Sequence, residues 1–237
     1  MIKIKNLSHS YSGKQILKNV SLEIEKGSIH SLVGTTGAGK TLLLRILARL
    51  ENKQEGVIEN EHITSSFVFQ RHALFPWLKL SKNIEITSGK SASEIRPLLQ
   101  KFNLDEYIDQ YPHQLSGGTL QKFNLLRAFI MNAEIIYLDE PFSHLDPIQR
   151  ESSYDFMMRL WNESKPTIIL VTHDIDEALL LSHKISFLSK KHMSIRHTFQ
   201  VKETGSMLNE TLLSQRSNPQ CQKIYNETYL LIKEDLA

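Results

Sequence analysis

Apolar and polar residues alternate through the first part of the chain in the way that strands require. Apolar positions recur at every second residue around Ile2 and again around Leu22, and turn signals stand at residues 12–14 and 26–27. We therefore predict antiparallel hairpins over residues 1–32.

The pattern changes near residue 29. An apolar run over 29–33 leads into a glycine-rich stretch, and apolar residues with helical spacing follow until about Leu50. Two further apolar runs, 56–58 and 65–69, predict strands, the second of which ends at Gln70. This order predicts a strand, a glycine-rich turn, a helix and two more strands.

Helical spacing dominates from about residue 71 to 131. After an irregular apolar loop, helices are predicted from Ser81, which is a candidate cap, over 93–99, over 104–111 and from about Thr119. We interpret 71–131 as a mostly helical subdomain that is inserted into an α/β core.

Strands and helices alternate again from residue 134. Buried strands are predicted at 134–138, 167–171 and 184–188, and amphipathic helices at 150–161 and 175–181. Such alternation favours a parallel sheet with crossover connections. The predicted fold class is α/β, with a mixed or parallel core sheet, an antiparallel N-terminal β-subdomain and the inserted helical subdomain. A single domain over 1–237 ends in a short helical tail at about 204–237.

Composition changes this picture little. A chain of 237 residues with 41% apolar and 23% charged residues suits one large globular domain. The net charge of +2 gives no electrostatic reason to expect a nucleic acid as partner. The single cysteine, Cys221, excludes an intrachain disulfide and a cysteine-based metal site. No stretch has the apolar length of a signal peptide or a membrane span, so we expect a soluble chain.

The glycine-rich stretch fits the phosphate-binding pattern G-x-x-x-x-G-K-[ST]. Its residues are Gly34, Thr35, Thr36, Gly37, Ala38, Gly39, Lys40 and Thr41. The glycines allow backbone N–H groups to point at an anion, and the following helix adds its positive N-terminal end. Lys40 could reach the β- and γ-phosphates of a nucleotide, and the Thr41 hydroxyl could bind Mg²⁺. A turn that only joins strand to helix is the alternative.

A second anion cradle is possible at Ser116, Gly117 and Gly118, which stand where a long helix begins. An ordinary serine–glycine turn is the alternative. Tyr11, in the N-terminal strands, could stack on a base or simply pack.

Polar side chains follow three of the predicted core strands. Asp139 and Glu140 come after one strand, His173 after the next, and Gln70 after an earlier one. Ligands bind at this edge of a parallel sheet. Asp139 suits Mg²⁺, Glu140 could orient an attacking water, and His173 could hydrogen-bond a γ-phosphate. Gln70 could bind Mg²⁺ or position water. A solvated strand end and a helix-capping histidine are the alternatives.

The order of these motifs resembles the ATP-binding subunit of ATP-binding cassette (ABC) transporters over roughly residues 1–200. The matching segments are GTTGAGKT, Gln70, LSGG, YLDEP, SHLD and THD. The resemblance implies a P-loop NTPase of the ABC type that hydrolyses ATP with Mg²⁺, with Gln70, Glu140 and His173 at the reacting phosphate and with Thr41, Gln70 and Asp139 at the metal.

The same resemblance implies that Tyr11 stacks on adenine and that residues 34–41 hold the phosphates. It implies an ATP-dependent dimer, in which Ser116, Gly117 and Gly118 contact the γ-phosphate bound by the other subunit and Asp146 lies in the loop along the interface. Thr119, Lys122, His144 and His183 depart from the usual pattern.

Residues 69–77 and 172–179 are similar to those of nitrate, sulfonate and taurine importers. This implies a subunit at the cytoplasmic face of the cell membrane, held there by a separate permease and served indirectly by a substrate-binding protein. Leu74, Phe75 and Trp77 are then candidates for permease docking, or they pack within the helical subdomain. The alternatives are an ABC subunit for export or lipid handling, and a soluble ABC-type ATPase.

Overall fold

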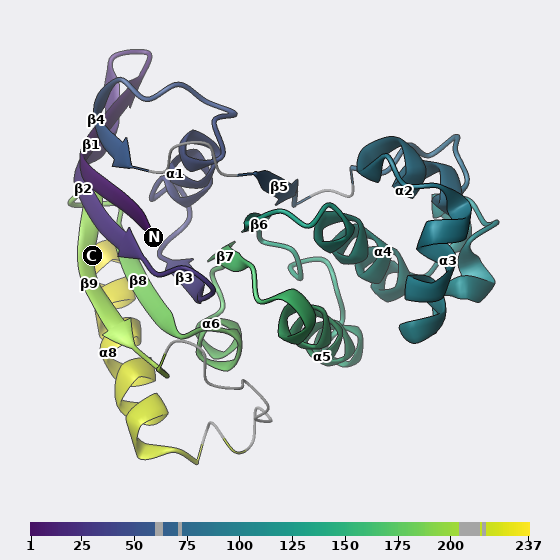
Figure 1. Ribbon diagram of the computed structural model, residues 1–237. Coiled ribbons are helices and arrows are strands. Elements are labelled where there is room, and N and C mark those ends of the chain that lie inside the picture. The colour runs from purple at the N-terminus through teal and green to yellow at the C-terminus, as the bar shows by residue number, and fades with distance from the viewer. Residues whose placement is uncertain (60–63, 71–72, 204–213, 215–216) are drawn as a thin grey trace.

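The computed structural model describes residues 1–59, 64–70, 73–203, 214 and 217–237 (Figure 1). The strands are β1 (Ile2–Tyr11), β2 (Lys14–Ile24), β3 (Ile29–Val33), β4 (Glu55–Glu59), β5 (Ser65–Val68), β6 (Ile135–Asp139), β7 (Thr167–Val171), β8 (Lys184–Ser189) and β9 (Ser194–Gln200). The α-helices are α1 (Lys40–Leu47), α2 (Leu80–Ser88), α3 (Ala92–Lys101), α4 (Gly117–Ile130), α5 (Pro147–Ser164), α6 (Ile175–Leu181) and α8 (Pro219–Leu236). Two single 3₁₀ turns are η1 (Asp105–Tyr107) and η2 (Pro112–Gln114).

The strands form two sheets. A three-stranded antiparallel sheet has the order β2-β1-β4, and a six-stranded sheet has the order β5-β6-β7-β3-β8-β9. The pairs from β5 to β8 are parallel, and β9 pairs with β8 in the antiparallel direction. The α/β fold class predicted from the sequence is therefore confirmed. Strand β9 was not predicted, because it is a sheet edge in which Phe199 is the only fully buried side chain.

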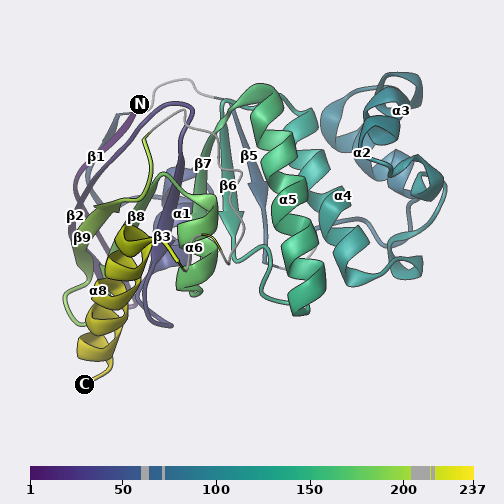
Figure 2. The same ribbon diagram turned by 90° about the horizontal axis from the view of Figure 1, so that it is seen from below.

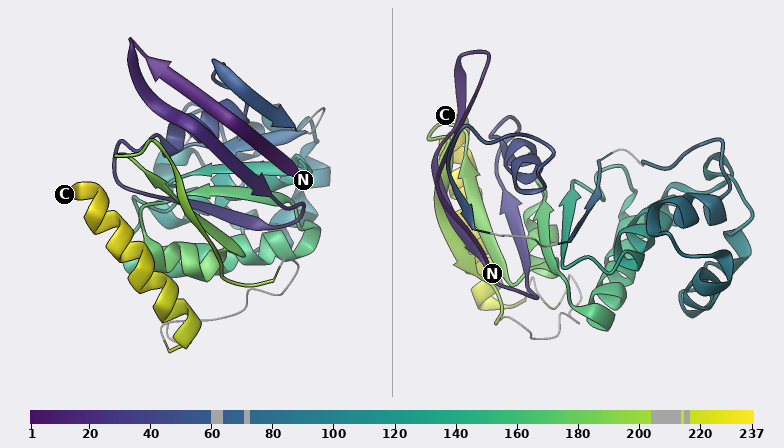
Figure 3. Two further views of the ribbon diagram at one scale, coloured as in Figure 1. Left: turned by 90° about the vertical axis from the view of Figure 1, so that its left-hand side faces the viewer. Right: turned by 45° about the horizontal axis from the view of Figure 1, so that its top comes forward.

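Helix α1 lies between the two sheets, as Figures 1 and 3 show. Its apolar face, which includes Leu43, Leu44 and Leu47, packs into one cluster with the inward residues of β1 and β2 and with one face of β6 and β7. Burial of these side chains stabilises the helix, since eight residues form too short a helix to be stable alone. The first residues of α1 are thereby held at one edge of the core sheet.

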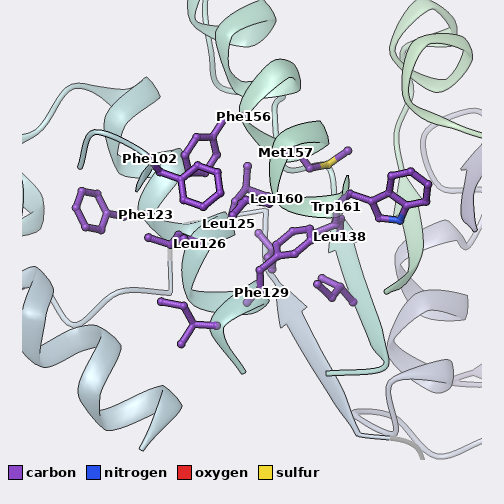
Figure 4. Packing of buried hydrophobic residues seen from close by; sticks show 14 of the residues in the cluster. Phe102, Phe123, Leu125, Leu126, Phe129, Leu138, Phe156, Met157, Leu160 and Trp161 are labelled. Carbon is purple, nitrogen blue, oxygen red and sulfur yellow. The ribbon is translucent and has the colours of Figure 1, made fainter. Parts of the chain in front are cut away.

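The opposite face of the core sheet is covered by α4 and α5 (Figure 2). Successive residues of β6 divide between the two faces, so that Tyr137 packs with α1 while Leu138 packs with α4 and α5. The larger cluster contains the fully buried Trp161, and Phe102 meets Phe156 edge-on across the boundary between α3 and α5 (Figure 4). Helices α2 and α3 project beyond α4, away from the antiparallel sheet (Figures 1 and 2).

The start of α2 differs from the prediction, in which Ser81 caps the helix. The helix begins one residue earlier, and Ser81 lies within it. The amides of Leu80 and Ser81 donate to the carbonyls of Gln110 and Ile108, each at 2.9 Å. These tertiary bonds satisfy the free N–H groups that a side-chain cap would otherwise satisfy.

The predicted helix over 104–111 is also replaced, by the single turn η1. Two carbonyls of this segment accept hydrogen bonds from α2, so they are turned away from the partners that a longer helix would give them. Among the described residues, no helix combines the length and apolar character needed to cross a membrane. Arg71, His72 and the tail positions 204–213 lie outside the described residues.

Candidate functional site

Four parallel strands end at the same edge of the core sheet, and each delivers polar residues there. Strand β3 leads into residues 34–41, β5 into Gln70, β6 into Asp139 and Glu140, and β7 into His173. A cavity of about 510 Å³ opens at this edge. It is lined by Ile16, Thr36, Gly37, Ala38, Gly39, Lys40, Thr41, Leu42, Gln70, Glu140 and His173. Most residues that were predicted singly along the chain are therefore brought together.

The turn before α1 requires glycine at two positions for steric reasons. A Cβ atom at Gly34 would lie 2.3 Å from the Leu188 carbonyl oxygen of β8. Gly39 has φ of 96° and precedes the first residue of α1, with Ile16 and Leu17 close to where a Cβ would stand. The turn thus adopts a backbone path that L side chains rarely permit. It presents the amides at the N-terminus of α1 to the cavity.

Lys40 is folded back onto the turn. Its Nζ donates to the carbonyl of Gly34 at 2.8 Å and to that of Thr35 at 3.1 Å. Burial lowers the pKa of Lys40, and the neighbouring carboxylates of Glu140 and Asp139 oppose that shift. An anion in the cavity would offer this ammonium a charged partner in place of two carbonyl dipoles.

Thr41 and Asp139 form the second pair. The Thr41 hydroxyl donates to Asp139 Oδ1 at 2.9 Å. Burial raises the pKa of Asp139, and the hydrogen bond from Thr41 opposes that rise only in part. A hydroxyl and a carboxylate are hard oxygen donors of the kind that bind Mg²⁺ in proteins. A divalent cation beside them would also relieve the cost of burying the carboxylate.

Glu140 lies between the two remaining polar side chains. Its Oε2 atom is 3.3 Å from Gln70 Nε2, which donates to it, and 3.5 Å from His173 Nδ1. The backbone of Glu140 has φ of 45°, and its amide donates to the Val171 carbonyl at 2.9 Å. The peptide is thus fixed to β7, and the carboxylate is held against His173 and Gln70. Such a carboxylate can accept a proton from water or orient it.

Helix α1 is fastened to β6 at its far end as well. The Tyr137 hydroxyl donates to the Leu47 carbonyl at 2.9 Å in the core. Burial raises the pKa of Tyr137 to about 12. Together with the bond between Thr41 and Asp139, this contact fixes the helix along the strand that carries the two carboxylates.

Three other predicted residues stand apart from the cavity. In the part of the chain that the structure describes, Ser116, Gly117 and Gly118 line no part of it; they begin α4, where the Ser116 hydroxyl accepts from the Thr119 amide at 3.2 Å. Gly118 lies against Gln149 of α5, because a Cβ there would come within 3.2 Å of the Gln149 side chain. The Ser116 hydroxyl and the first amides of α4 are thus kept in one orientation.

Asp146 and Tyr11 also lie outside the lining of the cavity. The Asp146 carboxylate caps α5 by accepting from the Gln149 amide at 2.9 Å. Tyr11 is 58% exposed at the end of β1, and its ring is 6.2 Å from that of His9. Stacking of Tyr11 on a nucleotide base therefore stays a prediction.

Two contributors to the site were missed by sequence reasoning. Ile16 of β2 lines the cavity although its own strand pattern is unremarkable. Asp235 of α8 accepts a hydrogen bond from the Thr35 hydroxyl at 2.7 Å. The sequence carries no local signal for either contact, since both depend on which distant elements pack beside the turn.

Residues 17–143 match the sequence model of a family described as "ABC transporter". The chain is 35% identical over 199 residues to the aliphatic sulfonates import ATP-binding protein of Bacillus cereus, a match that covers 79% of each chain. It is 34% identical over 203 residues to the protein of the same description in Bacillus subtilis, with 80% of each chain covered.

Solved structures show the same architecture. A dimeric ATP-binding cassette in a post-hydrolysis state, bound to ADP and Pi, superimposes with a TM-score of 0.73. The alignment has 28% sequence identity and covers 86% of this chain and 100% of that one.

Proposed function

The chain belongs to the ABC transporter family, and on that premise we propose that it drives the import of aliphatic sulfonates through a separate permease. The family and the ATPase activity predicted from the sequence are confirmed by the match over residues 17–143 and by the importer subunits to which the chain is similar. The convergence of Lys40, Glu140 and His173 on one cavity carries the ATPase part of the proposal, and the similarity to the sulfonate import subunits supports the choice of substrate.

The phosphate-binding turn and the polar side chains of the cavity have separate tasks in this proposal. The turn over 34–41 binds the phosphates through its amides, and Lys40 leaves the two carbonyls to pair with the β- and γ-phosphates. Glu140 polarises the attacking water, while His173 and Gln70 hold its carboxylate in place.

Magnesium fits the pair formed by Thr41 and Asp139, and Gln70, which lines the same cavity, is a further candidate ligand. The buried carboxylate, with its raised pKa, is a group that gains from a cation. When bound, Mg²⁺ neutralises charge on the phosphate oxygens. The protein contributes the two oxygen donors and their fixed separation.

A second copy of the chain completes the site. Ser116, Gly117 and Gly118 lie away from the cavity of their own subunit, yet they form a helix N-terminus with free amides that suits an anion. We assign them to the γ-phosphate held by the partner subunit, with Asp146 in the loop along the interface. ATP then joins the two copies, and its hydrolysis releases them.

The helical region offers a docking surface for the permease. Trp77 is 70% exposed and Phe75 is 37% exposed, with their rings 5.7 Å apart. Leu74 instead packs into the core, and Asn83 binds both the amide and the carbonyl of Phe75. The two aromatic rings are thus presented outward on a fixed backbone, as a partner helix would require. Docking there holds the subunit at the cytoplasmic face of the membrane.

Reconstitution tests the proposal. The chain is expressed with any permease and binding protein whose genes adjoin its own, and ATP-driven uptake of an aliphatic sulfonate into vesicles is measured. We expect sulfonate uptake that excess nitrate does not inhibit. Uptake of nitrate instead, or outward transport, would replace the sulfonate assignment by one of the alternatives, and failure of any permease to copurify would favour a soluble ATPase.

The docking surface has its own test within the same system. Trp77→Ala should reduce copurification of the permease and uncouple ATP hydrolysis from uptake, while the isolated subunit keeps its ATPase rate. Tyr229→Ala is the matched control, because Tyr229 is a similarly exposed aromatic residue on α8, on the other side of the molecule (Figure 1). Equal copurification of both variants would exclude Trp77 from docking.

A further inference from the structure

The last turn of α8 reaches the phosphate-binding turn through a single carboxylate. Asp235 Oδ2 accepts from the Thr35 hydroxyl at 2.7 Å, although 200 residues separate the two in sequence. The same carboxylate accepts from the amides of Lys190 and Lys191, each at 2.9 Å, and from the Ser189 hydroxyl. Four donors therefore occupy the four acceptor positions of one carboxylate.

These donors determine the charge of Asp235. Partial burial by itself raises the pKa of this carboxyl, but the hydrogen bonds from Ser189, Lys191, Thr35 and Lys190 outweigh it and hold the pKa below its usual value. Asp235 is consequently ionised at neutral pH. Its hydrogen bonds are charge-assisted and stronger than those between neutral groups.

Thr35 lies at a sensitive position in the turn. Its carbonyl accepts from Lys40 Nζ at 3.1 Å, and the preceding residue, Gly34, presses against β8. The hydroxyl of Thr35 points to Asp235 instead of lining the cavity. Asp235, Thr35 and Lys40 thus form a continuous chain of polar contacts from α8 to the lysine that meets the phosphates.

The position of Asp235 is itself set by packing. Cys221 and Ile224 of α8 are buried in a cluster with α6, β8 and β9, and Leu231 and Ile232 pack against it. Val33, the last residue before the turn, belongs to the same cluster. The helix and the turn therefore share one rigid base, and the carboxylate joins them at a defined separation.

We propose that Asp235 is a positioning residue for ATP binding, which holds the phosphate-binding turn in its binding-ready conformation and couples α8 to nucleotide affinity. Fixing Thr35 in advance reduces the conformational entropy that the turn loses when phosphates bind. This inference rests on the proposed role of residues 34–41 as the ATP site. It assigns a function to a helix that carries none of the family's motifs.

ATP binding and steady-state hydrolysis by the purified full-length subunit test the inference. Asp235→Asn keeps the size of the side chain but replaces one acceptor oxygen by an NH₂ group. That group cannot accept from the surrounding N–H and O–H donors. We expect this substitution to weaken ATP binding about tenfold to a hundredfold, the effect of losing one charge-assisted hydrogen bond. The loss should appear in KM, with kcat unchanged, because Asp235 does not touch the reacting groups. Glu234→Gln removes the same charge from the adjacent position and should leave both constants unchanged.

Variants of Thr35 distinguish a specific contact from general stability. Thr35→Val should reproduce the loss of ATP affinity, whereas Thr35→Ser, which keeps the hydroxyl, should bind ATP nearly as well as the wild type. The double variant Asp235→Asn with Thr35→Val should lose no more affinity than either single variant. A normal ATP affinity in Asp235→Asn accompanied by a lower Tm would overturn the inference, because the carboxylate would then only fasten α8. Additive losses in the double variant would also overturn it. An absence of ATP binding by the wild-type chain would instead refute the proposed site itself.

Discussion

The Thr41 hydroxyl and the Asp139 carboxylate are joined by a 2.9 Å hydrogen bond across 98 residues of sequence. Strand β7 lies between β3 and β6 in the sheet, so Thr41 reaches Asp139 only because α1 crosses β7 and packs on β6. The contact joins the two residue types that suit Mg²⁺. The metal-binding role that we propose for both residues can be tested by substitution.

Asp139→Asn and Thr41→Ala should each raise the Mg²⁺ concentration for half-maximal ATP hydrolysis by about tenfold or more, since each removes one oxygen ligand or its charge. Because burial raises the pKa of Asp139, the neutral asparagine should fold at least as stably as the wild type. A Mg²⁺ titration and a thermal unfolding curve measure the two effects. Asp155→Asn, an exposed position on α5, is the control. An unchanged Mg²⁺ requirement in both variants would remove the pair from the metal site.

Glu140→Gln should reduce ATP hydrolysis by about a hundredfold or more, because the amide cannot accept the proton of the attacking water. ATP binding should persist, so that a dimer with ATP accumulates and is seen by size-exclusion chromatography. Glu134→Gln, just before the other end of β6, should hydrolyse ATP normally. Glu140 would lose its catalytic role if its glutamine variant retained the wild-type rate.

His173→Ala should lower kcat about tenfold or more while ATP affinity stays the same. The imidazole lies 3.5 Å from the Glu140 carboxylate, so its loss frees that carboxylate to leave the reacting position. Single-turnover hydrolysis and equilibrium ATP binding separate the two quantities. His197→Ala, on the exposed face of β9, provides the comparison. An equal reduction of kcat in both variants would show that His173 has no specific role in holding Glu140.

Mixing two inactive variants tests whether a second copy completes each site. Lys40→Ala disables phosphate binding, and Ser116→Asp keeps an effective cap on α4 while placing a negative charge at the proposed γ-phosphate contact. In a mixed dimer one site contains both changes and the other contains neither. In an equal mixture about half of the dimers are mixed, so activity should return to about a quarter of the wild-type rate if the two sites act independently. No recovery in dimers shown to be mixed would refute the shared site.

Glu177 should make the stability of the fold depend on pH. Burial raises its pKa from 4.5 to about 8, although the Tyr154 hydroxyl donates to its carboxylate at 3.0 Å. Between those pH values the folded chain holds a proton that the unfolded chain releases, so the free energy of unfolding falls as pH rises, by up to about 1.4 kcal/mol per pH unit.

Glu177→Gln should remove that contribution. Urea unfolding at pH 6 and pH 8 should show the variant gaining stability relative to the wild type at the higher pH. Glu151→Gln, an exposed position on α5, should follow the wild type at both values. An identical pH dependence in Glu177→Gln and the wild type would mean that the carboxyl is ionised in the folded protein.

Local pattern was sufficient for most elements of this chain. The alternation around Ile2 and Leu22 and the apolar runs at 135–138 and 167–171 correspond to observed strands, because such runs are stable only when one or both faces are covered. The polar residues after those strands were predicted to meet for a simple reason: the carboxyl ends of parallel strands share an edge.

Tertiary contacts decided what local pattern could not. Ser81 loses its capping role because the carbonyls of Ile108 and Gln110 satisfy the amides of α2 from a segment more than one helix away. Strand β9 exists because β8 offers it an edge to pair with. The partner is distant in sequence for α2, whereas for β9 it is the preceding strand of a hairpin. In both places a backbone hydrogen-bonding group is satisfied outside its own element.

The amino-acid sequence by itself determined the chemistry of the site. It places a glycine-rich turn before Lys40 and Thr41, and it places Asp139 and Glu140 after a buried strand. The three-dimensional arrangement decided which atoms meet. Gly34 has to be glycine because β8 passes beside it, and Thr35 is held by Asp235 from the last turn of α8. Residue types and their spacing determine the chemistry that a side chain can perform. Its partners depend on how distant elements pack, and local sequence patterns carry no information about that packing.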